Sequence, residues 1–232
     1  MFLQRSSTVL LGLTASCLVL GGCNASTAAG PSKAVLHFVN LMTGGSGSLV
    51  FNINGSTTGT TVTFPGSSSC QKTPAAATDF AVEPSGSSTA LATLSGETLT
   101  VGGVYTVFAT GSTTTPFLIF LTNTYITPAT GHAQIRVINA VGTGSPFDVY
   151  IGASGAALGT VNQSNVTFNS TSQPFVDVPA GATEVRVTTP GTQTVLGTST
   201  FTLTSGEILT VAFAPPLTVG GGFPAALVAE CQ

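Results

Sequence analysis

The stretch AVLHFVN at residues 34–40 returns further along the chain as AQIRVIN at residues 133–139. In both versions hydrophobic side chains recur at every second position, which is the period of a β-strand with one buried face. Both versions also begin with alanine and end with asparagine. This repetition predicts two domains of the same kind, each of about 100 residues.

Four further blocks recur in the same order and at a nearly constant spacing. The pairs are 49–53 with 147–151, 62–64 with 166–168, 78–82 with 183–187, and 104–107 with 208–211. Turn-forming pairs such as Asn54-Gly55 and Pro190-Gly191 separate the blocks. Many short strands divided by turns indicate antiparallel sheets packed face to face, so we predict an all-β chain of two tandem antiparallel β-sandwich domains.

The N-terminal segment has the features of a secretory signal, with one basic residue, Arg5, and an apolar run from Val9 to Leu20. The stretch LGGC at residues 20–23 resembles the lipobox of bacterial lipoproteins. By that resemblance the signal is cut between Gly22 and Cys23, and the Cys23 thiol carries diacylglycerol. One alternative is an ordinary secretory signal cut elsewhere. A membrane-spanning anchor is disfavoured, because a spanning helix needs about 20 mostly apolar residues and polar residues interrupt this run.

We therefore divide the chain into five parts. They are a lipoprotein signal peptide at 1–22, a flexible tether at 23–32, a first β-sandwich at 33–128, a linker at 129–131 and a second β-sandwich at 132–232. Each sandwich is long enough to bury a modest hydrophobic core. Asn24 stands where lipoproteins retained at the inner membrane of enterobacteria have aspartate, so the resemblance favours the outer membrane, on its periplasmic or its surface face.

The composition excludes one class of partner. Charged residues make up 6% of the chain, against about 25% in typical globular proteins. Acidic residues outnumber basic ones, 8 to 5, so no basic patch can neutralise phosphates and we do not expect nucleic acid as a partner. Serine, threonine, glycine and asparagine supply an uncharged polar surface, as in a secreted β-protein.

Two cysteines remain once Cys17 leaves with the signal peptide and Cys23 is lipidated. Cys70 and Cys231 form an even pair in an oxidising compartment, so they are a candidate disulfide. The alternative is two separate thiols. The sequence leaves both arrangements open.

No catalytic or metal-binding motif is recognisable in the sequence. His37 occupies the strand position that Arg136 holds in the second repeat, so we expect it to be exposed, and His132 begins the next such strand. A metal site needs three or four converging ligands, and no His or Cys cluster has the spacing of ligands. The sequence also lacks a Gly-x-Ser-x-Gly elbow and a P-loop, so we expect neither an enzyme nor a bound metal or other cofactor.

Asp148 and Tyr150 are weak candidates for a surface site. Both lie on the strand face opposite Phe147, Val149 and Ile151. One interpretation is a polar site on a sheet surface. The favoured alternative is a solvated strand face on which an aromatic ring covers its neighbours.

Three stretches of the second repeat form a further pattern. They are IRVINA at 135–140, FDVYI at 147–151 and VPAG at 178–181. These stretches resemble the bacterial domain-of-unknown-function family 4397, and the first repeat, which keeps FVN at 38–40 and VYTV at 104–107, resembles it less closely. The resemblance spans nearly all of residues 34–230 and implies exported, often tandem, immunoglobulin-like or transthyretin-like sandwiches. It brings no established activity and no catalytic residues.

These features together predict a lipid-anchored protein of the cell envelope with a non-enzymatic binding, adhesion or structural role. The expected partners are the membrane, through the lipid at Cys23, and an envelope protein or polysaccharide. The alternatives are an envelope hydrolase and a small-ligand-binding lipoprotein, each with a site built from loops. A concave pocket lined by aromatic residues and paired acids would favour these alternatives.

Overall fold

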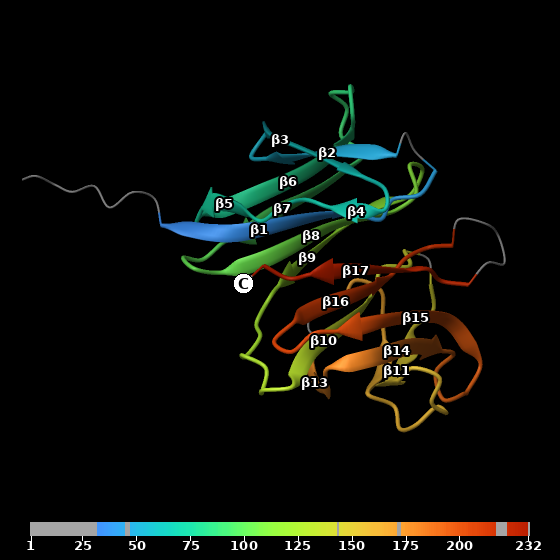
Figure 1. Ribbon diagram of the computed structural model, residues 1–232. Coiled ribbons are helices and arrows are strands. Elements are labelled where there is room, and N and C mark those ends of the chain that lie inside the picture. The colour runs from blue at the N-terminus through green and yellow to red at the C-terminus, as the bar shows by residue number, and fades with distance from the viewer. Residues whose placement is uncertain (1–31, 45–46, 143, 171–172, 217–221, 232) are drawn as a thin grey trace, which may run out of the picture. The chain divides into compact units, whose positions relative to one another are not determined.

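The computed structural model describes residues 32–44, 47–142, 144–170, 173–216 and 222–231, and every regular element in them is a β-strand (Figure 1). Pro31–Gln232 form one compact unit. The predicted signal peptide, the lipidation site at Cys23 and the tether before Ser32 lie outside the described residues. Within the described part of the chain, no helix is long and apolar enough to cross a membrane.

The first repeat forms two sheets. Its strands are β1 (Lys33–Asn40), β2 (Ser48–Ile53), β3 (Ser56–Thr63), β4 (Gly66–Ser67), β5 (Gln71–Pro74), β6 (Ala77–Pro84), β7 (Ala92–Thr98), β8 (Val104–Gly111) and β9 (Pro116–Thr122). One sheet has the order β3-β2-β6-β7. The other has the order β4-β1-β8-β9, and β5 also pairs with β1.

The second repeat forms the same two sheets from its own strands. They are β10 (His132–Asn139), β11 (Phe147–Ala153), β12 (Gln163–Val166), β13 (Val176–Pro179), β14 (Gly181–Thr188), β15 (Val195–Leu203), β16 (Ile208–Phe213) and β17 (Ala225–Ala229). The sheet orders are β12-β11-β14-β15 and β13-β10-β16-β17. The blocks that repeat in the sequence thus form equivalent strands, and the all-β sandwich prediction is confirmed.

One strand pairing in each repeat differs from the expected antiparallel arrangement. β1 pairs with β8, and β10 with β16, in parallel. Strands of the opposite sheet separate the two members of each pair in sequence, so the connection crosses the sandwich and returns in the same direction. The other pairings between the named strands are antiparallel.

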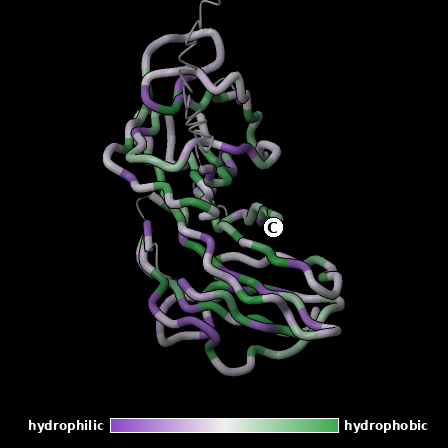
Figure 2. Tube along the Cα trace, turned by 90° about the vertical axis from the view of Figure 1, so that its left-hand side faces the viewer, coloured by the Kyte–Doolittle hydropathy of each residue, from purple (hydrophilic) through white to green (hydrophobic). Residues whose placement is uncertain are grey.

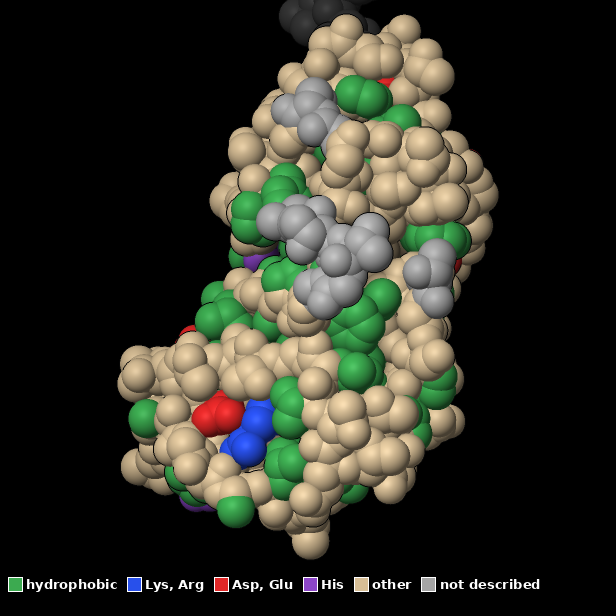
Figure 3. All heavy atoms as spheres, turned by 90° about the vertical axis from the view of Figure 1, so that its right-hand side faces the viewer, with side chains coloured by type: hydrophobic (Ala, Val, Ile, Leu, Met, Phe, Trp, Pro, Cys, Tyr) green, Lys and Arg blue, Asp and Glu red, His purple; other side chains and the backbone are tan. Residues whose placement is uncertain are grey.

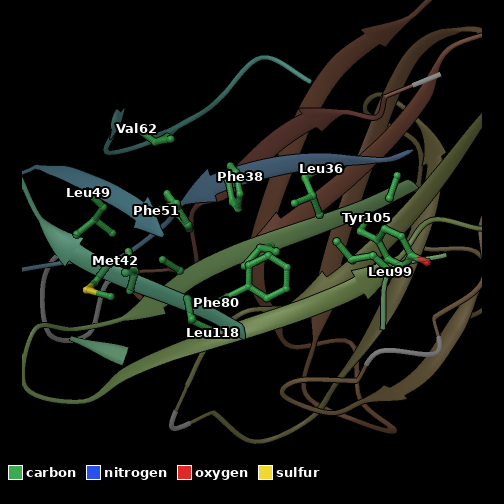
Figure 4. Packing of buried hydrophobic residues seen from close by; sticks show 14 residues of the cluster. Leu36, Phe38, Met42, Leu49, Phe51, Val62, Phe80, Leu99, Tyr105 and Leu118 are labelled. Atoms are coloured by element: carbon green, nitrogen blue, oxygen red, sulfur yellow. The ribbon is translucent and has the colours of Figure 1, made fainter. Parts of the chain in front are cut away.

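Each repeat has its own hydrophobic core between its two sheets. In the first repeat, Phe38 of β1 stacks on Phe51 of β2 with ring centroids 4.7 Å apart, and Leu36 lies beside them (Figure 4). In the second repeat, Ile135 and Val137 of β10 hold the corresponding places. Each such side chain, once buried, contributes about 1.5–3 kcal/mol of hydrophobic stabilisation. Hydrophobic segments accordingly run along the strands of both repeats (Figure 2).

A third hydrophobic cluster joins the two repeats. It consists of Val39, Leu41, Phe108, Ile119 and Leu121 from the first repeat and of Ile138, Ala140, Ala212, Ala214 and Val228 from the second. These side chains project from the faces of the β4-β1-β8-β9 and β13-β10-β16-β17 sheets that do not face the two sandwich cores. We call them the junction cluster.

The junction cluster covers the second face of each of these two sheets. Nearly every residue of β8, β10 and β16 is therefore buried. The expectation that His37 is exposed is wrong, because His37 is only 4% exposed, and its counterpart Arg136 is 2% exposed. Alternation along a strand reports which side chains share a face, but not whether that face meets water.

Candidate functional site

A group of buried polar side chains lies at the junction between the repeats, where equivalent residues meet. Asn123 and Glu230 follow the equivalent strands β9 and β17, and their backbone N–H groups donate to Val104 and Ile208, respectively. The other two equivalent pairs are Thr106 with Thr210 and His37 with Arg136. All six of these side chains are 7% exposed or less. We call them the junction polar cluster.

Arg136 and Glu230 form an ion pair at the centre of the junction polar cluster. Arg136 Nη2 lies 3.0 Å from Glu230 Oε1, and their side chains are 2% and 0% exposed. The guanidinium also donates to Asn123 Oδ1 at 2.7 Å and to Thr210 Oγ1 at 3.0 Å. It lies over the ring of Phe175, 4.6 Å from the centroid, which adds a cation–π contact.

Residues from both repeats hold the carboxylate of Glu230. Thr106 Oγ1 donates to Glu230 Oε2 at 3.0 Å, and Asn123 Nδ2 donates to the same oxygen at 2.6 Å. Thr210 donates to the other carboxylate oxygen. Two donors from the first repeat thus bind a carboxylate that the second repeat supplies, so the cluster specifies how the two sandwiches meet.

Two opposing effects act on the guanidinium of Arg136. Burial lowers the pKa of Arg136, whereas the charge and hydrogen bond of Glu230 raise it. A guanidinium nevertheless stays protonated in proteins. Because the ion pair is buried and its hydrogen-bonding groups are engaged, the arrangement can orient the repeats but presents no group to a substrate.

His37 lies at the edge of the junction polar cluster. Its Nε2 is 2.8 Å from the carbonyl oxygen of Ser68, while its buried Nδ1 makes no hydrogen bond within the described part of the chain. Burial lowers the pKa of His37, and the charge of Glu230 and the hydrogen bond to Ser68 offset part of this effect. The ring is therefore neutral near pH 7 and donates its Nε2 proton to Ser68.

A disulfide bond lies beside the junction polar cluster and joins the two repeats. Cys70 and Cys231 are joined, with their Cα atoms 6.0 Å apart, and Cys231 directly follows Glu230. Tyr125 donates a hydrogen bond to the carbonyl oxygen of Cys231 at 2.6 Å. Burial, with a smaller effect from Glu230, raises the pKa of Tyr125, so its phenol keeps the proton that it donates. The pairing that the sequence left open thus links a loop of the first repeat to the end of the second.

The structure does not bring Asp148 to the surface. Asp148 is 5% exposed, and its two oxygens accept hydrogen bonds from the backbone N–H groups of Asn165 and Gly191, both at 2.8 Å. It therefore joins β12 to the turn after β14 and is not available to an external ligand. Tyr150 is half-buried opposite Arg186 on β14, so the two candidates do not form a common site.

His132 lies outside the junction polar cluster. Its Nδ1 is 2.5 Å from Asp177 Oδ2, and the two side chains are 39% and 41% exposed. Two ligands are too few for a typical metal site. Elsewhere in the described ranges, no group of three or more His, Cys, Asp or Glu residues could hold a metal ion.

Sequence reasoning missed Arg136, Glu230 and Asn123 as a group. One signal was present, because Arg136 is a charged residue inside an apolar block and Glu230 adjoins a cysteine that is a candidate for pairing. The sequence does not show which residues are partners, because the partners lie far apart in the chain. Asn123 and Glu230, for example, are 107 positions apart.

A family model described as domain of unknown function, DUF4397, matches the chain twice, at residues 34–142 and 133–230. No curated protein matches the chain.

Proposed function

Because the chain belongs to the DUF4397 family and carries two copies of its domain, we propose that it is a lipid-anchored cell-envelope protein with a non-enzymatic binding, adhesion or structural role. The observation that carries this proposal is the set of contacts that join the two repeats. A disulfide, the hydrogen bonds that Thr106 and Asn123 donate to Glu230, and the junction cluster hold both repeats in one compact unit. Such a unit suits a protein that presents fixed surfaces to a partner.

The spacing between the anchor and the first strand supports a role close to the membrane. The lipobox-like cysteine is Cys23, and β1 begins at Lys33. A fully extended tether of this length spans about 35 Å at most. The folded unit would therefore stay near the membrane, held by two or three acyl chains that each contribute about 0.8 kcal/mol per buried CH₂.

The disulfide between Cys70 and Cys231 supports export. Disulfides form and persist in oxidising compartments such as the periplasm and the cell surface, and they are rare in the cytosol. The outer membrane is the proposed location where the source has one, since Asn24 follows Cys23.

The character of the surface supports binding through shape and neutral polar groups. On the face shown in Figure 3, charged side chains are few and uncharged atoms predominate. A surface of this kind gives little electrostatic steering. It fits an envelope protein or a polysaccharide as the partner, and it does not fit a highly charged polymer.

The anchor is tested by comparing Cys23→Ser with Cys17→Ser, since both replace a cysteine of the N-terminal segment. Mass spectrometry of the mature N-terminus should find a lipid-modified Cys23 in the unaltered protein and in Cys17→Ser. Cys23→Ser should leave unprocessed precursor or released protein. An unmodified N-terminus that starts elsewhere in the unaltered protein would overturn the proposal.

The binding role is tested separately with the intact lipidated protein. Capture of the lipidated protein from envelope extracts should retrieve a defined envelope protein or polysaccharide. The Cys23→Ser variant, if it is released from the membrane, does not meet this partner in cells and should not retrieve it. Turnover of an envelope polymer by the purified protein would instead support the hydrolase alternative.

A further inference from the structure

Strand β17 lies at the edge of its sheet, beside β16, and leaves one row of backbone groups unpaired (Figure 1). The backbone N–H of Glu230, directly after β17, donates to the carbonyl oxygen of Ile208 at 3.0 Å. Hydrogen-bonded positions alternate along an antiparallel pair, so residues 226 and 228 also face β16. Three residues instead direct their N–H and C=O groups away from β16, where these groups make no hydrogen bond within the described part of the chain: Ala225, Leu227 and Ala229.

A groove of about 260 Å³ runs beside this open edge. Residues 225–228 form one wall, and Val39 of β1 with residues 65–67 forms the other. Ser67 is opposite Val39 in the ladder between β4 and β1, at a position where its backbone groups also point away from β1. The groove thus presents unpaired backbone groups from both repeats.

The disulfide ties the two walls of the groove together. Cys70 comes shortly after the wall segment 65–67, and Cys231 comes shortly after residue 228. The groove is therefore a product of the junction between the repeats, and neither repeat forms it alone. A site that is formed in advance loses less conformational entropy when a partner binds.

β17 lacks the features that usually protect an edge strand from further pairing. Bulges interrupt the ladders of the edge strands β3, β7, β12 and β15, and β5 and β13 each contain a charged residue and a proline. β4 has only two residues, and β9 lies beside β7. β17 has the sequence AALVA, pairs with β16 without a bulge and leaves Leu227 45% exposed. It is a regular, uncharged edge that a further strand can join.

We propose that an extended, uncharged segment of a polypeptide partner binds in this groove and adds a strand to β17. The inference rests on the proposed binding role and specifies the chemistry of the partner. Unpaired groups at every second residue of a strand recur about every 6.8 Å, and the edge of another extended chain presents N–H and C=O groups at the same spacing. A neutral polysaccharide such as cellulose has no amide groups to pair with them. The segment is uncharged because the lining residues offer no counter-charge to a side chain that loses its water.

A single segment fits the groove better than a second copy of this chain does. In a symmetric pairing of two β17 edges, each copy brings its own residues 65–67 beside the edge of the other. A groove of about 260 Å³ has room for a few small side chains, but not for a second wall of this kind.

The test uses the natively processed protein, purified in a mild detergent, and a short capped peptide of alternating threonine and valine. N-methyl groups on every second residue of this probe leave one edge free to pair. The control peptide carries an N-methyl group on every residue, so neither of its edges can donate a hydrogen bond. NMR should show the probe binding with a dissociation constant of about a millimolar. At ten times that concentration, hydrogen exchange of the Leu227 and Ala229 amides should slow about tenfold.

Leu227→Pro removes one outward N–H group and keeps the pairing with β16, because residue 227 does not donate to β16. This variant should bind the probe about tenfold more weakly, since a backbone acceptor of the peptide loses its donor. Leu227→Val is the matched control, because it changes the same side chain but keeps the N–H group, and it should bind as the unaltered protein does.

The two peptides decide the question even if Leu227→Pro does not fold. Equal binding of the probe and the fully methylated peptide would overturn the proposal, and so would unchanged exchange of the β17 amides at saturating probe. A dimer in analytical ultracentrifugation that Leu227→Pro abolishes would assign the edge to a second copy instead. Lipidation at Cys23 and capture from envelope extracts are measured separately, so a failure here is distinguishable from a failure of the proposed function.

Discussion

Asn40 and Asn139 hold the same place in the two repeats and make the same hydrogen bonds. Their Nδ2 groups donate to the carbonyl oxygens of Val62 at 2.9 Å and Val166 at 3.1 Å. Their Oδ1 atoms accept from the backbone N–H two residues further on, at 3.0 Å in both cases. The asparagine that ends each repeated block thus fastens the first strand of each sandwich to the end of its third.

The buried histidine makes stability depend on pH. Burial holds the pKa of His37 in the folded protein below its usual value of 6.5. Below pH 6.5 the unfolded chain therefore binds a proton that the folded protein does not, and the free energy of unfolding falls as the pH is lowered toward the folded pKa. His37→Gln should remove this part of the pH dependence in urea titrations between pH 7 and pH 5. An unchanged slope would contradict the prediction.

The ion pair of the junction polar cluster should show strong coupling between its members. Arg136→Met leaves Glu230 buried without a counter-charge and should lower the free energy of unfolding by about 3–5 kcal/mol. The double variant Arg136→Met, Glu230→Leu removes both charges and should recover most of this loss. Urea denaturation of the single and double variants measures the coupling. A double variant that is less stable than both single variants would contradict it.

At the scale of the strands, burial on two faces distinguishes the inner sheets from the outer ones. All six residues of β16 are buried, whereas the edge strand β3 is mostly exposed. β16 has the sandwich core on one face and the junction cluster on the other. The sequence of a strand with both faces covered is a nearly continuous hydrophobic run, as in parallel sheets.

The turn between β2 and β3 depends on a left-handed backbone. Asn54 has a φ of 49° and Gly55 a φ of 72°, as a two-residue type I′ hairpin requires. Gly55→Ala should therefore lower the free energy of unfolding by about 1–2 kcal/mol. The control is Gly152→Ala, because Gly152 lies outside the left-handed region with open space around its Cβ position, and this change should be nearly neutral. Thermal unfolding of the two variants provides the comparison.

At the scale of the whole molecule, the junction makes one unit from two sandwiches that have separate cores. Among the named strands, every pairing stays within one repeat. The disulfide, the junction polar cluster and the junction cluster all connect one repeat to the other. The strand pairing is thus local to each repeat, while the junction is shared.

Separated halves test this division. Residues 32–130 and 131–232, produced with serine at Cys70 and Cys231, should each give a β-sheet circular dichroism spectrum, because each half has its own core. Each should unfold at lower denaturant than the joined chain, since the junction cluster becomes exposed to water. Mixed halves should associate in size-exclusion chromatography. Two unfolded halves would mean that the repeats depend on each other to fold.

The disulfide should be a major source of stability. It joins residues 161 positions apart, and chain entropy alone assigns such a closed loop about 5 kcal/mol. Serine at both Cys70 and Cys231 should lower the free energy of unfolding by up to this amount, as measured in urea. Non-reducing peptide mapping of the exported protein should recover the two cysteines in one linked peptide pair. Two free thiols would contradict the prediction.

The repeated blocks predicted two domains and the strands that these blocks form, and alternation within the blocks identified core residues such as Phe38, Phe51 and Phe147. Alternation and turn residues are local properties, so they can be read along the chain without knowledge of distant contacts. The asparagines at 40 and 139 and the chain-wide repeat were visible for the same reason.

The cover on the second face of the inner sheets depends on contacts between the two repeats. His37 and Asp148 look like exposed strand residues in the sequence, yet packing between the repeats buries His37, and hydrogen bonds from β12 and from the turn after β14 engage Asp148. The partners of Arg136 come from positions far along the chain, such as Glu230. A periodic pattern records which side chains share a face, but the contact that removes that face from water forms only when the two sandwiches meet.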